Sequence, residues 1–274
     1  MQKQPVIVIT GCSTGIGLET ARYLKDRFIV VYPTARDVND VQMLRELGFD
    51  NALELDVRDA SQIASVIQSV LDSEGRIDTW FNNAGYGQVG AIEDIGTEVL
   101  KEQFETNVFG LHECTRQIIP IMREQGFGKI IQHSSVLGIT SLFGRGAYNA
   151  SKYAVEGLTD TLRLELHDTD IYPILLNTGP VTSNFRETAV KMLQKNVDIV
   201  SSHFAERYRA NIEGDAKKVP FNEEAEAVAS VVHKIILDPH PSPRYYITKA
   251  TYILGYAKRI LSTSWLDRLL LKIG

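Results

Sequence analysis

The feature of this sequence that most constrains its fold is a glycine-rich loop between a short apolar run and a helical pattern. The apolar run is Val6–Thr10, and the loop follows it directly as Gly11–Gly17, with glycines at its first, fifth and seventh positions. Such glycines permit a tight turn and bring backbone N–H groups close to a pyrophosphate at the amino end of the next helix. We therefore expect a strand, a phosphate-binding loop and a helix here; the alternative is a tight turn without a ligand.

Short apolar runs then alternate with helical patterns along most of the chain. The predicted strands are Val6–Thr10, Phe28–Thr34, Ala52–Leu55, Thr79–Asn82, Lys129–His133, Ile171–Asn177 and Arg244–Thr248. The predicted helices are Ile16–Lys25, Val38–Leu47, Ala60–Leu71, Glu98–Arg123, Tyr148–Leu166 and Asn222–Leu237, the last with Asn222 as its cap. Strands that alternate with helices form parallel sheets with right-handed crossovers. The predicted fold class is α/β, a doubly wound parallel sheet of Rossmann type, in one domain spanning residues 1–274.

Composition narrows the class of function. The chain has 274 residues, 44% of them apolar, and a net charge of −5 without a basic run, which gives no reason to expect nucleic-acid binding. Its two cysteines, Cys12 and Cys114, predict no disulfide framework. We see neither a signal peptide nor a long apolar segment, so the expected location is cytoplasmic. The spacing of the six histidines predicts no metal site.

The end of the second predicted strand bears on which dinucleotide would bind. In such folds a carboxylate at this point accepts from the ribose 2′-OH, whereas an arginine suits a 2′-phosphate. We place Ala35 last in the strand and Arg36 directly after it, which favours NADP(H) through charge-assisted pairing. Two alternatives stay open. A shift of one residue would bring Asp37 to the ribose, and Arg36 could be an ordinary surface charge.

Tyr148 and Lys152 are the predicted catalytic pair. Four residues apart on a helix, they share one face, and a nearby ammonium favours the phenolate of a tyrosine that otherwise titrates near ~10. Tyr245 and Lys249 repeat the spacing, but they lie in a predicted strand, where residues four apart are about 13 Å from each other. We therefore choose Tyr148 and Lys152.

A serine at the carboxyl end of the fifth predicted strand lies where ligands bind in such sheets. Ser135 would orient a substrate oxygen toward Tyr148, and Ser134 is the alternative because neighbouring strand residues face opposite sides. Asn107 lies inside a helical stretch; it could hold a water or bend the helix, and by itself it reads as a surface residue.

The motifs together resemble the short-chain dehydrogenase/reductase family over roughly Val6–Val181. They are the glycine loop, Asn82-Asn83-Ala84-Gly85, Asn107, Ser135 and Tyr148-x₃-Lys152, in the family's order and spacing. The thirteen residues from Ser135 to Tyr148 match the family and favour Ser135 over Ser134. Within the family the chain is similar to NADP-dependent aldehyde reductases and to the hydroxysteroid and retinol dehydrogenase branch.

The resemblance implies a role for each matching position. Tyr148 would be the general acid/base, Lys152 would lower its pKa and bind the nicotinamide ribose, and Ser135 would position the substrate oxygen. Asn107 would hold a water that relays protons through Lys152. With the loop and Arg36, the expected cofactor-binding residues are Gly11, Ser13, Thr14, Gly15, Ile16, Gly17, Arg36, Asp56, Val57, Asn83, Ala84, Gly85, Tyr148, Lys152, Gly179 and Val181.

The expected substrate is a lipophilic carbonyl or alcohol, because apolar side chains gather in the regions that would cover the cleft. A flap over residues 183–220 is predicted to close on it. The expected substrate-binding residues are Ser135, Leu137, Leu142, Phe143, Tyr148 and Phe185. For Leu137 and Val181 an ordinary core position is the open alternative.

The amphipathic, cationic tail Tyr252–Ile273 could cap the pocket, contact a second subunit or touch a membrane surface; we favour packing against the protein. The resemblance implies a homodimer or homotetramer built through helices such as Glu98–Arg123 and Tyr148–Leu166. Two other classes remain. A non-catalytic NADP(H) sensor would not need the Tyr148–Lys152–Ser135 set, and a sugar-nucleotide epimerase would need a larger substrate domain than this chain has.

Overall fold

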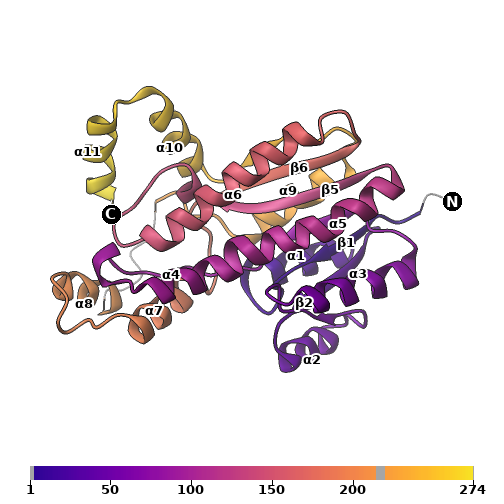
Figure 1. Ribbon diagram of the computed structural model, residues 1–274, viewed down its shortest axis with the longest axis horizontal. Helices are drawn as coiled ribbons and strands as arrows, with labels where there is room; N and C mark the ends of the chain where they lie inside the picture. Colours follow the sequence, from indigo (N-terminus) through magenta and orange to yellow (C-terminus); the bar gives the residue numbers. More distant parts are fainter. Residues whose placement is uncertain (1–2, 214–219, 274) are drawn as a thin grey trace.

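A computed structural model of the chain describes residues 3–213 and 220–273 (Figure 1). Its centre is a parallel sheet in the order β3-β2-β1-β4-β5-β6-β7. The strands are β1 (Val6–Ile9), β2 (Val30–Ala35), β3 (Leu53–Glu54), β4 (Thr79–Asn82), β5 (Gly128–Ser135), β6 (Ile171–Thr178) and β7 (Arg244–Tyr246). The order reverses between β1 and β4, and the carboxyl ends of strands at such a point form a ligand-binding crevice. The predicted Rossmann-type fold is confirmed.

Helices cover both faces of this sheet because its strands are apolar on both sides. In β1, Ile7 and Ile9 pack on one side with α1 (Gly15–Lys25), α2 (Val38–Glu46) and α9 (Ala225–Leu237). Val6 and Val8 face the other side, with α3 (Ala60–Glu74) and α5 (Leu111–Gln125). α6 (Gly146–Glu165) joins this second layer through Val155, which packs on Leu175 of β6.

The single helix predicted over Glu98–Arg123 is in fact three segments. α4 (Thr97–Phe104) passes into a π-helical turn, η2 (Glu105–Gly110), before α5 begins at Leu111. Asn107 lies in this turn and is 1% exposed, so its reading as a surface residue was wrong. The helical pattern of the sequence predicted one continuous helix, because it does not distinguish a single π-helical turn from the α-helical turns on either side of it.

Other boundaries also differ from the prediction. Asn222 does not cap α9, because this helix begins at Ala225, after Glu224. The side-chain amide of Asn222 donates instead to the hydroxyl of Thr182. Pro173 is accommodated in β6 because β7 pairs with that strand only from Leu175 onward, so the missing N–H falls at a locally unpaired edge.

The predicted flap and tail are both helical. Within residues 183–220, α7 (Phe185–Asn196) and α8 (Ala205–Glu213) form a small lobe, and residues 214–219 lie outside the described part of the chain. The tail is two helices, α10 (Lys249–Ile260) and α11 (Thr263–Ile273), rather than one. Figure 1 shows this lobe and the two tail helices at the end of the molecule far from the N-terminus. Among the described residues, no helix combines the length and apolarity that a membrane span requires.

Candidate active site

The glycine loop has the close contacts that only glycines allow. Gly11 has a φ of +71°, and a Cβ there would lie 2.8 Å from the Cα of Ala84. A Cβ on Gly17 would lie 2.3 Å from the carbonyl oxygen of Gly11. α1 begins at Gly15. Its cap residue Thr14 makes no side-chain hydrogen bond to the helix, and the first turn of α1 contains no acidic residue. This leaves backbone donors and the positive end of the helix dipole for a pyrophosphate, so the loop fits a dinucleotide.

The turn after β4 is fastened to this loop. The side-chain amide of Asn83 donates to the carbonyl oxygens of Thr10 at 2.9 Å and Gly11 at 3.0 Å. The backbone N–H of Ala84 donates to the hydroxyl of Thr10 at 2.9 Å, and Gly85 follows, exposed. The structure thus brings together three predicted cofactor residues with the loop they were expected to adjoin.

The end of β2 lies where the sequence placed it. Ala35 is the last strand residue, and Arg36 follows it, exposed. The carboxylate of Asp37 accepts from the backbone N–H of Asn39 at 2.8 Å and so caps α2. The carboxylate of Asp37 is thus used as a helix cap, whereas the side chain of Arg36 is exposed.

Asp56 and Val57 follow β3, at the edge of the same crevice. Val57 is buried, and a Cβ on Gly110 of η2 would lie 2.7 Å from its side chain. Arg58 forms an ion pair with Asp56 at 2.5 Å, and this hydrogen bonding keeps the pKa of the Asp56 carboxyl below its usual range. The charge of Arg36 also reaches Asp56 and lowers its pKa. Our sequence reasoning missed Arg58, a second cation at the expected adenosine end.

Tyr148 lies in the first turn of α6, buried, with its ring among Val136, Leu137 and Leu254. Burial raises the pKa of its phenol to about 12, opposed by a hydrogen bond with Ser135 and by the charge of Arg145. The lowered pKa expected from Lys152 is therefore not found: burial dominates, and the phenol is protonated at neutral pH. Arg145, the residue before α6, was passed over in the sequence as part of a loop, because only the fold brings its charge to the phenol.

Lys152 is buried one turn further along α6. Its ammonium lies 5.6 Å from the ring centroid of Tyr148 and donates to the carbonyl oxygen of His133 at 2.6 Å. Burial lowers the pKa of Lys152 to about 8, against the attraction of Glu156.

The imidazole of His133 bridges Asn83 at 3.0 Å and Thr178 at 3.1 Å. Burial and the charge of Lys152 lower its pKa to about 3, so it is neutral.

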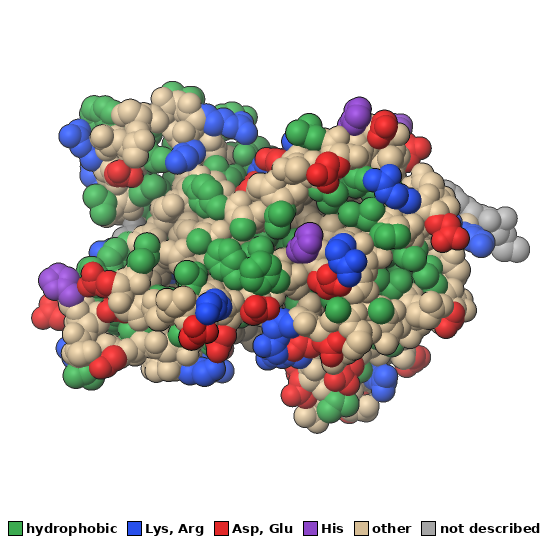
Figure 2. Space-filling model, in the orientation of Figure 1, with side chains coloured by type: hydrophobic (Ala, Val, Ile, Leu, Met, Phe, Trp, Pro, Cys, Tyr) green, Lys and Arg blue, Asp and Glu red, His purple; other side chains and the backbone are tan. Residues whose placement is uncertain are grey.

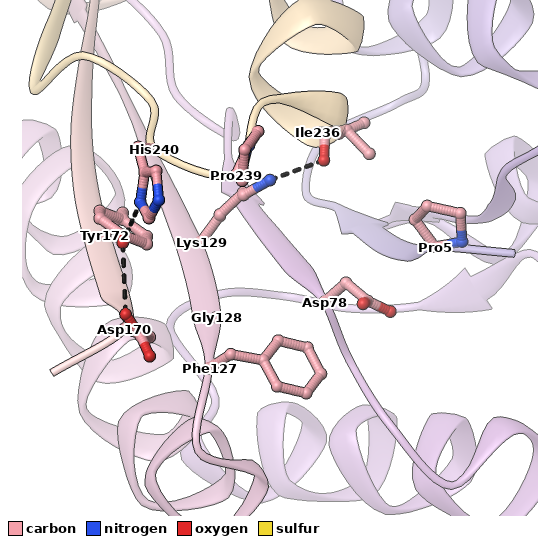
Figure 3. A pocket seen from close by; sticks show the side chains of 10 residues that line it. All are labelled: Pro5, Asp78, Phe127, Gly128, Lys129, Asp170, Tyr172, Ile236, Pro239 and His240. Carbon is pink, nitrogen blue, oxygen red and sulfur yellow. Dashed lines mark hydrogen bonds between the residues drawn. The ribbon is translucent and has the colours of Figure 1, made fainter. Parts of the chain in front are cut away.

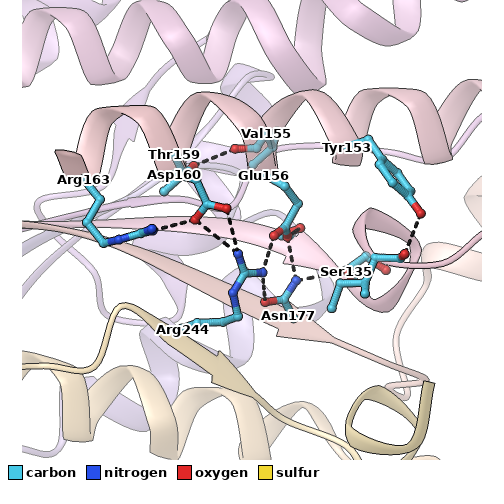
Figure 4. Close-up of polar contacts among 11 residues, drawn as sticks. Ser135, Tyr153, Val155, Glu156, Thr159, Asp160, Arg163, Asn177 and Arg244 are labelled. Atoms are coloured by element: carbon cyan, nitrogen blue, oxygen red, sulfur yellow. Dashed lines mark hydrogen bonds and ion pairs between the residues drawn. The ribbon is translucent and has the colours of Figure 1, made fainter. Parts of the chain in front are cut away.

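Ser135 and Ser134 face opposite sides of β5, and only one of them faces Tyr148. The hydroxyl of Ser135 lies near enough to the phenol to lower its pKa, and it accepts from the backbone N–H of Leu137 at 3.1 Å. The hydroxyl of Ser134 donates to Glu156, which also binds Arg244 and, at 2.6 Å, Asn177 (Figure 4). Ser134 thus belongs to a network that joins α6 to the sheet, and Ser135 belongs to the cleft.

Asn107 clamps the loop beyond Gly85. Its side chain accepts from the backbone N–H of Tyr86 at 3.1 Å and donates to the carbonyl of Tyr86 at 2.9 Å and to the hydroxyl of Ser151 at 3.2 Å. Both amide hydrogens are used in this way. A water at this point would need the second lone pair of the Asn107 oxygen or the backbone of the π turn.

The predicted substrate residues fall into separate places. Leu142 and Phe143 line a cleft of about 460 Å³, where the ring of Phe143 lies 5.0 Å from that of Phe204 in the flap. The ring of Phe185, the first residue of α7, is tilted against the ring of Tyr148, with 5.2 Å between the ring centroids. Leu137 packs in the cluster around Tyr148, together with Leu269 and Leu270 of α11.

Two predicted cofactor residues lie at the end of β6. Val181 packs against the main core and pairs with Glu223, which fits the alternative of an ordinary core position. A Cβ on Gly179 would lie 2.0 Å from the hydroxyl oxygen of Thr248, so this loop tightly contacts the start of α10.

A second cavity, of about 340 Å³, lies at the opposite ends of the strands (Figure 3). Its lining includes Lys129, whose ammonium donates to the carbonyl of Ile236 at 2.6 Å, and Tyr172, which hydrogen-bonds with His240. None of the predicted site residues lines it. The described residues contain no cluster of three metal-binding side chains.

Comparison with known proteins agrees with this geometry. A family model described as short chain dehydrogenase matches residues 5–194. The chain is 33% identical over 271 residues to the uncharacterized oxidoreductase YbbO of Escherichia coli (strain K12), covering 98% of this chain and 94% of that protein. It is 33% identical to human 17-beta-hydroxysteroid dehydrogenase type 1, covering 89% of this chain and 77% of the relative. The solved structure of a single-residue variant of actinorhodin polyketide ketoreductase with NADPH is 28% identical, with a TM-score of 0.76 and coverage of 93% of this chain and 98% of that one.

Proposed function

Since this chain belongs to the short-chain dehydrogenase/reductase family, we propose that it is an NADP(H)-dependent oxidoreductase acting on a carbonyl or alcohol group of a lipophilic small molecule. The observation that carries the proposal is the meeting of Tyr148, Ser135 and Lys152 at the carboxyl end of β5, beside the glycine loop. The three come from two elements, Ser135 from β5 and the other two from α6.

A nicotinamide dinucleotide held by the glycine loop would supply the hydride for the carbonyl carbon, or take it from the alcohol. The hydroxyl of Ser135 holds the substrate oxygen, and Tyr148 gives a proton to that oxygen as the carbonyl is reduced. The ammonium of Lys152 stabilises the phenolate that is left. With its pKa at about 12, the phenol of Tyr148 carries its proton at neutral pH and can donate it to the substrate oxygen.

The preference for NADP(H) rests on the end of β2. Arg36 is exposed directly after the strand, and the guanidinium of Arg58 lies nearby in an ion pair with Asp56. A guanidinium forms bidentate hydrogen bonds with a phosphate, whereas an uncharged ribose hydroxyl gains much less from it. The likeness to a ketoreductase that was solved with NADPH supports the same choice.

A lipophilic substrate is supported by the lining of the cleft. Leu142 and Phe143 line the cleft, and Leu142 also packs with the apolar side chains around Tyr148. Phe185 contacts the ring of Tyr148. A pocket of this kind excludes water and binds through apolar area, with Ser135 and Tyr148 as its polar anchors. Aldehydes of medium or long chain, retinoids and ketosteroids have this chemistry.

We propose a homo-oligomer, a dimer or tetramer, in the cytoplasm. Its support is the set of large apolar side chains exposed on the helices that the resemblance points to: Leu100, Phe109, Tyr153, Leu158 and Leu164. Covering them with a second copy would remove this area from water.

The test is consumption of NADPH, beside NADH, with medium-chain aldehydes, retinal and ketosteroids as substrates. Turnover with NADPH and at least one of these carbonyls supports the proposal. Tight NADPH binding without turnover on any of them would favour a non-catalytic sensor of NADP(H), and turnover with NADH alone would contradict the cofactor preference.

A further inference from the structure

The tail lobe, which we define as Lys249–Ile273, has an inner face that packs on the apolar cluster around Tyr148. Leu254 of α10 is buried against Tyr148 and Leu137, and Leu269 and Leu270 of α11 pack on the same cluster. α11 therefore covers one side of the cluster that contains Tyr148. Any route to Tyr148 along this side passes the lobe.

The outer surface of the tail lobe is unusually apolar for surface exposed to water. In α10, Tyr252, Ile253, Tyr256 and Ile260 are exposed, and their spacing of i, i+1, i+4 and i+8 places them on one side of the helix. In α11, Trp265 is 62% exposed and Leu271 is 71% exposed. Exposed patches of this kind mark binding surfaces.

The charge of the same lobe is opposite to that of the rest of the protein. Between Lys249 and Ile273 the sequence has five basic residues and one acidic residue, whereas the whole chain has a net charge of −5. All five, Lys249, Lys258, Arg259, Arg268 and Lys272, are exposed. Figure 2 shows green and blue side chains together on this lobe, with little red. Two partners could cover this surface, a second copy of the acidic chain or a lipid bilayer. The bilayer offers more apolar area, and an anionic bilayer offers both an apolar interior and negative charge.

We propose that the tail lobe docks on the surface of an anionic phospholipid bilayer. Trp265 and the exposed apolar residues of α10 enter the headgroup region, and the five cations pair with lipid phosphates. The inner face of α11 stays on the cluster around Tyr148, so a lipophilic carbonyl passes from the bilayer to Tyr148 along the lobe. This last step rests on the proposed function; the docking itself does not.

The experiment is co-sedimentation of the full chain with vesicles of phosphatidylcholine alone or with phosphatidylglycerol added. We expect binding to the anionic vesicles, and weaker binding in about 1 M salt, where the Debye length is ~3 Å. The emission of Trp265 should shift to shorter wavelength, because Trp80 is already buried and Trp265 is exposed. Trp265→Phe should lose most of the shift while the protein still sediments.

The deciding comparison is between two double variants with the same change in charge. Arg259→Glu/Arg268→Glu, within the tail lobe, should weaken binding to anionic vesicles at least about 30-fold, from roughly 1.4 kcal/mol per tenfold and ~1 kcal/mol per cation. Arg22→Glu/Arg123→Glu, two exposed arginines elsewhere, should bind nearly as the wild type does. Equal losses in both variants would overturn the proposal.

A wild-type chain that does not bind anionic vesicles would also overturn it. If Trp265→Ser/Ile260→Ser then lowers the sedimentation coefficient in ultracentrifugation, the lobe is covered by a second copy instead. Binding is measured without cofactor or substrate. Docking without turnover would therefore count against the proposed function alone, and turnover without docking would count against this proposal alone.

Discussion

The ammonium of Lys152 donates to the carbonyl oxygen of His133 at 2.6 Å, which ties α6 to β5 directly below Tyr148. The side chains of both residues have lowered pKa values, about 8 for Lys152 because of burial and about 3 for His133 because of burial and the charge of Lys152. Burying an ammonium costs free energy unless it is fully compensated. A protein selected for stability alone would not place a lysine here, which is the pattern expected of a functional site.

Replacing Lys152 with methionine should therefore stabilise the protein while removing activity. Lowering the pKa from 10.5 to about 8 corresponds to about 3 kcal/mol of destabilisation at pH 7, and the lost hydrogen bond offsets about 1 kcal/mol. We expect urea unfolding to show a gain of about 2 kcal/mol.

The sign of the pH dependence checks the cause. Between pH 8 and 10.5 the unfolded lysine binds more protons than the folded one, so its contribution to wild-type stability rises with pH in that window. The gain from Lys152→Met should shrink there. Lys101→Met, at an exposed ion pair, is the control and should change stability by less than about 0.5 kcal/mol at every pH. A gain independent of pH would point to packing instead.

Tyr148→Phe should lower kcat by about 10²–10⁴-fold, because it removes the proton donor and leaves the rest of the side chain in place. NADPH affinity should stay within about threefold of wild type, since one phenol hydroxyl is a small part of the cofactor contacts. Tyr153→Phe is the matched control: its hydroxyl donates to the carbonyl of Ile139 at 2.5 Å, away from Tyr148 on the same helix. Equal activity of the two variants would remove Tyr148 from the mechanism.

The pH profile should differ between the two directions of the reaction. Alcohol oxidation needs the phenolate of Tyr148, and with its pKa raised to about 12 in the free protein the phenolate fraction grows as pH rises. We expect kcat/KM for oxidation to increase between pH 6 and 8, while kcat/KM for reduction stays flat. An oxidation rate that falls over this range would show that Tyr148 is not the base.

Arg36→Ala should weaken NADPH binding about 10- to 100-fold, the equivalent of one or two charge-assisted hydrogen bonds, and leave NADH within about threefold. Fluorescence titration of both cofactors gives the ratio directly. Asp37→Asn serves as the counterpart, because its side chain caps α2 in the structure. If Asp37→Asn weakened NADH strongly instead, the carboxylate and not the guanidinium would face the ribose.

Arg244→Leu should destabilise the fold by roughly 3–5 kcal/mol, because it leaves the buried carboxylate of Glu156 without its cation. Arg244 joins β7 to α6 through Glu156 and Asp160 (Figure 4). Arg163→Ala removes the exposed pair with Asp160 and should cost less than about 1 kcal/mol in thermal or urea unfolding. Similar losses for both would show that Glu156 is compensated by Ser134 and Asn177 alone.

Several parts of this architecture could be predicted from local sequence. Apolar runs of strand length, the spacing of Gly11, Gly15 and Gly17 and the helical pattern after them define the parallel sheet and its phosphate loop, since each depends on backbone conformation over a few residues. The end of β2 at Ala35 and the shared face of Tyr148 and Lys152 follow from the same local periodicities.

The local sequence alone could not separate Ser135 from Ser134, and the family spacing was needed. Nor could the local sequence predict that Asn107 is buried, because a helical pattern does not show that this residue lies in a π-helical turn. The structure assigns Ser134 to Glu156 and Ser135 to the cleft because strand neighbours face opposite sides.

What the sequence by itself determined about this protein is its sheet, its glycine loop and the positions that carry the chemistry. Only the tertiary structure decided which distant segments meet there: the carbonyl of His133 under Lys152, the ring of Phe185 on Tyr148, and α11 over the cluster around Tyr148. The reason is physical. Propensity and periodicity act over one or two turns, whereas contacts between segments far apart depend on how whole apolar faces pack, which no local pattern encodes.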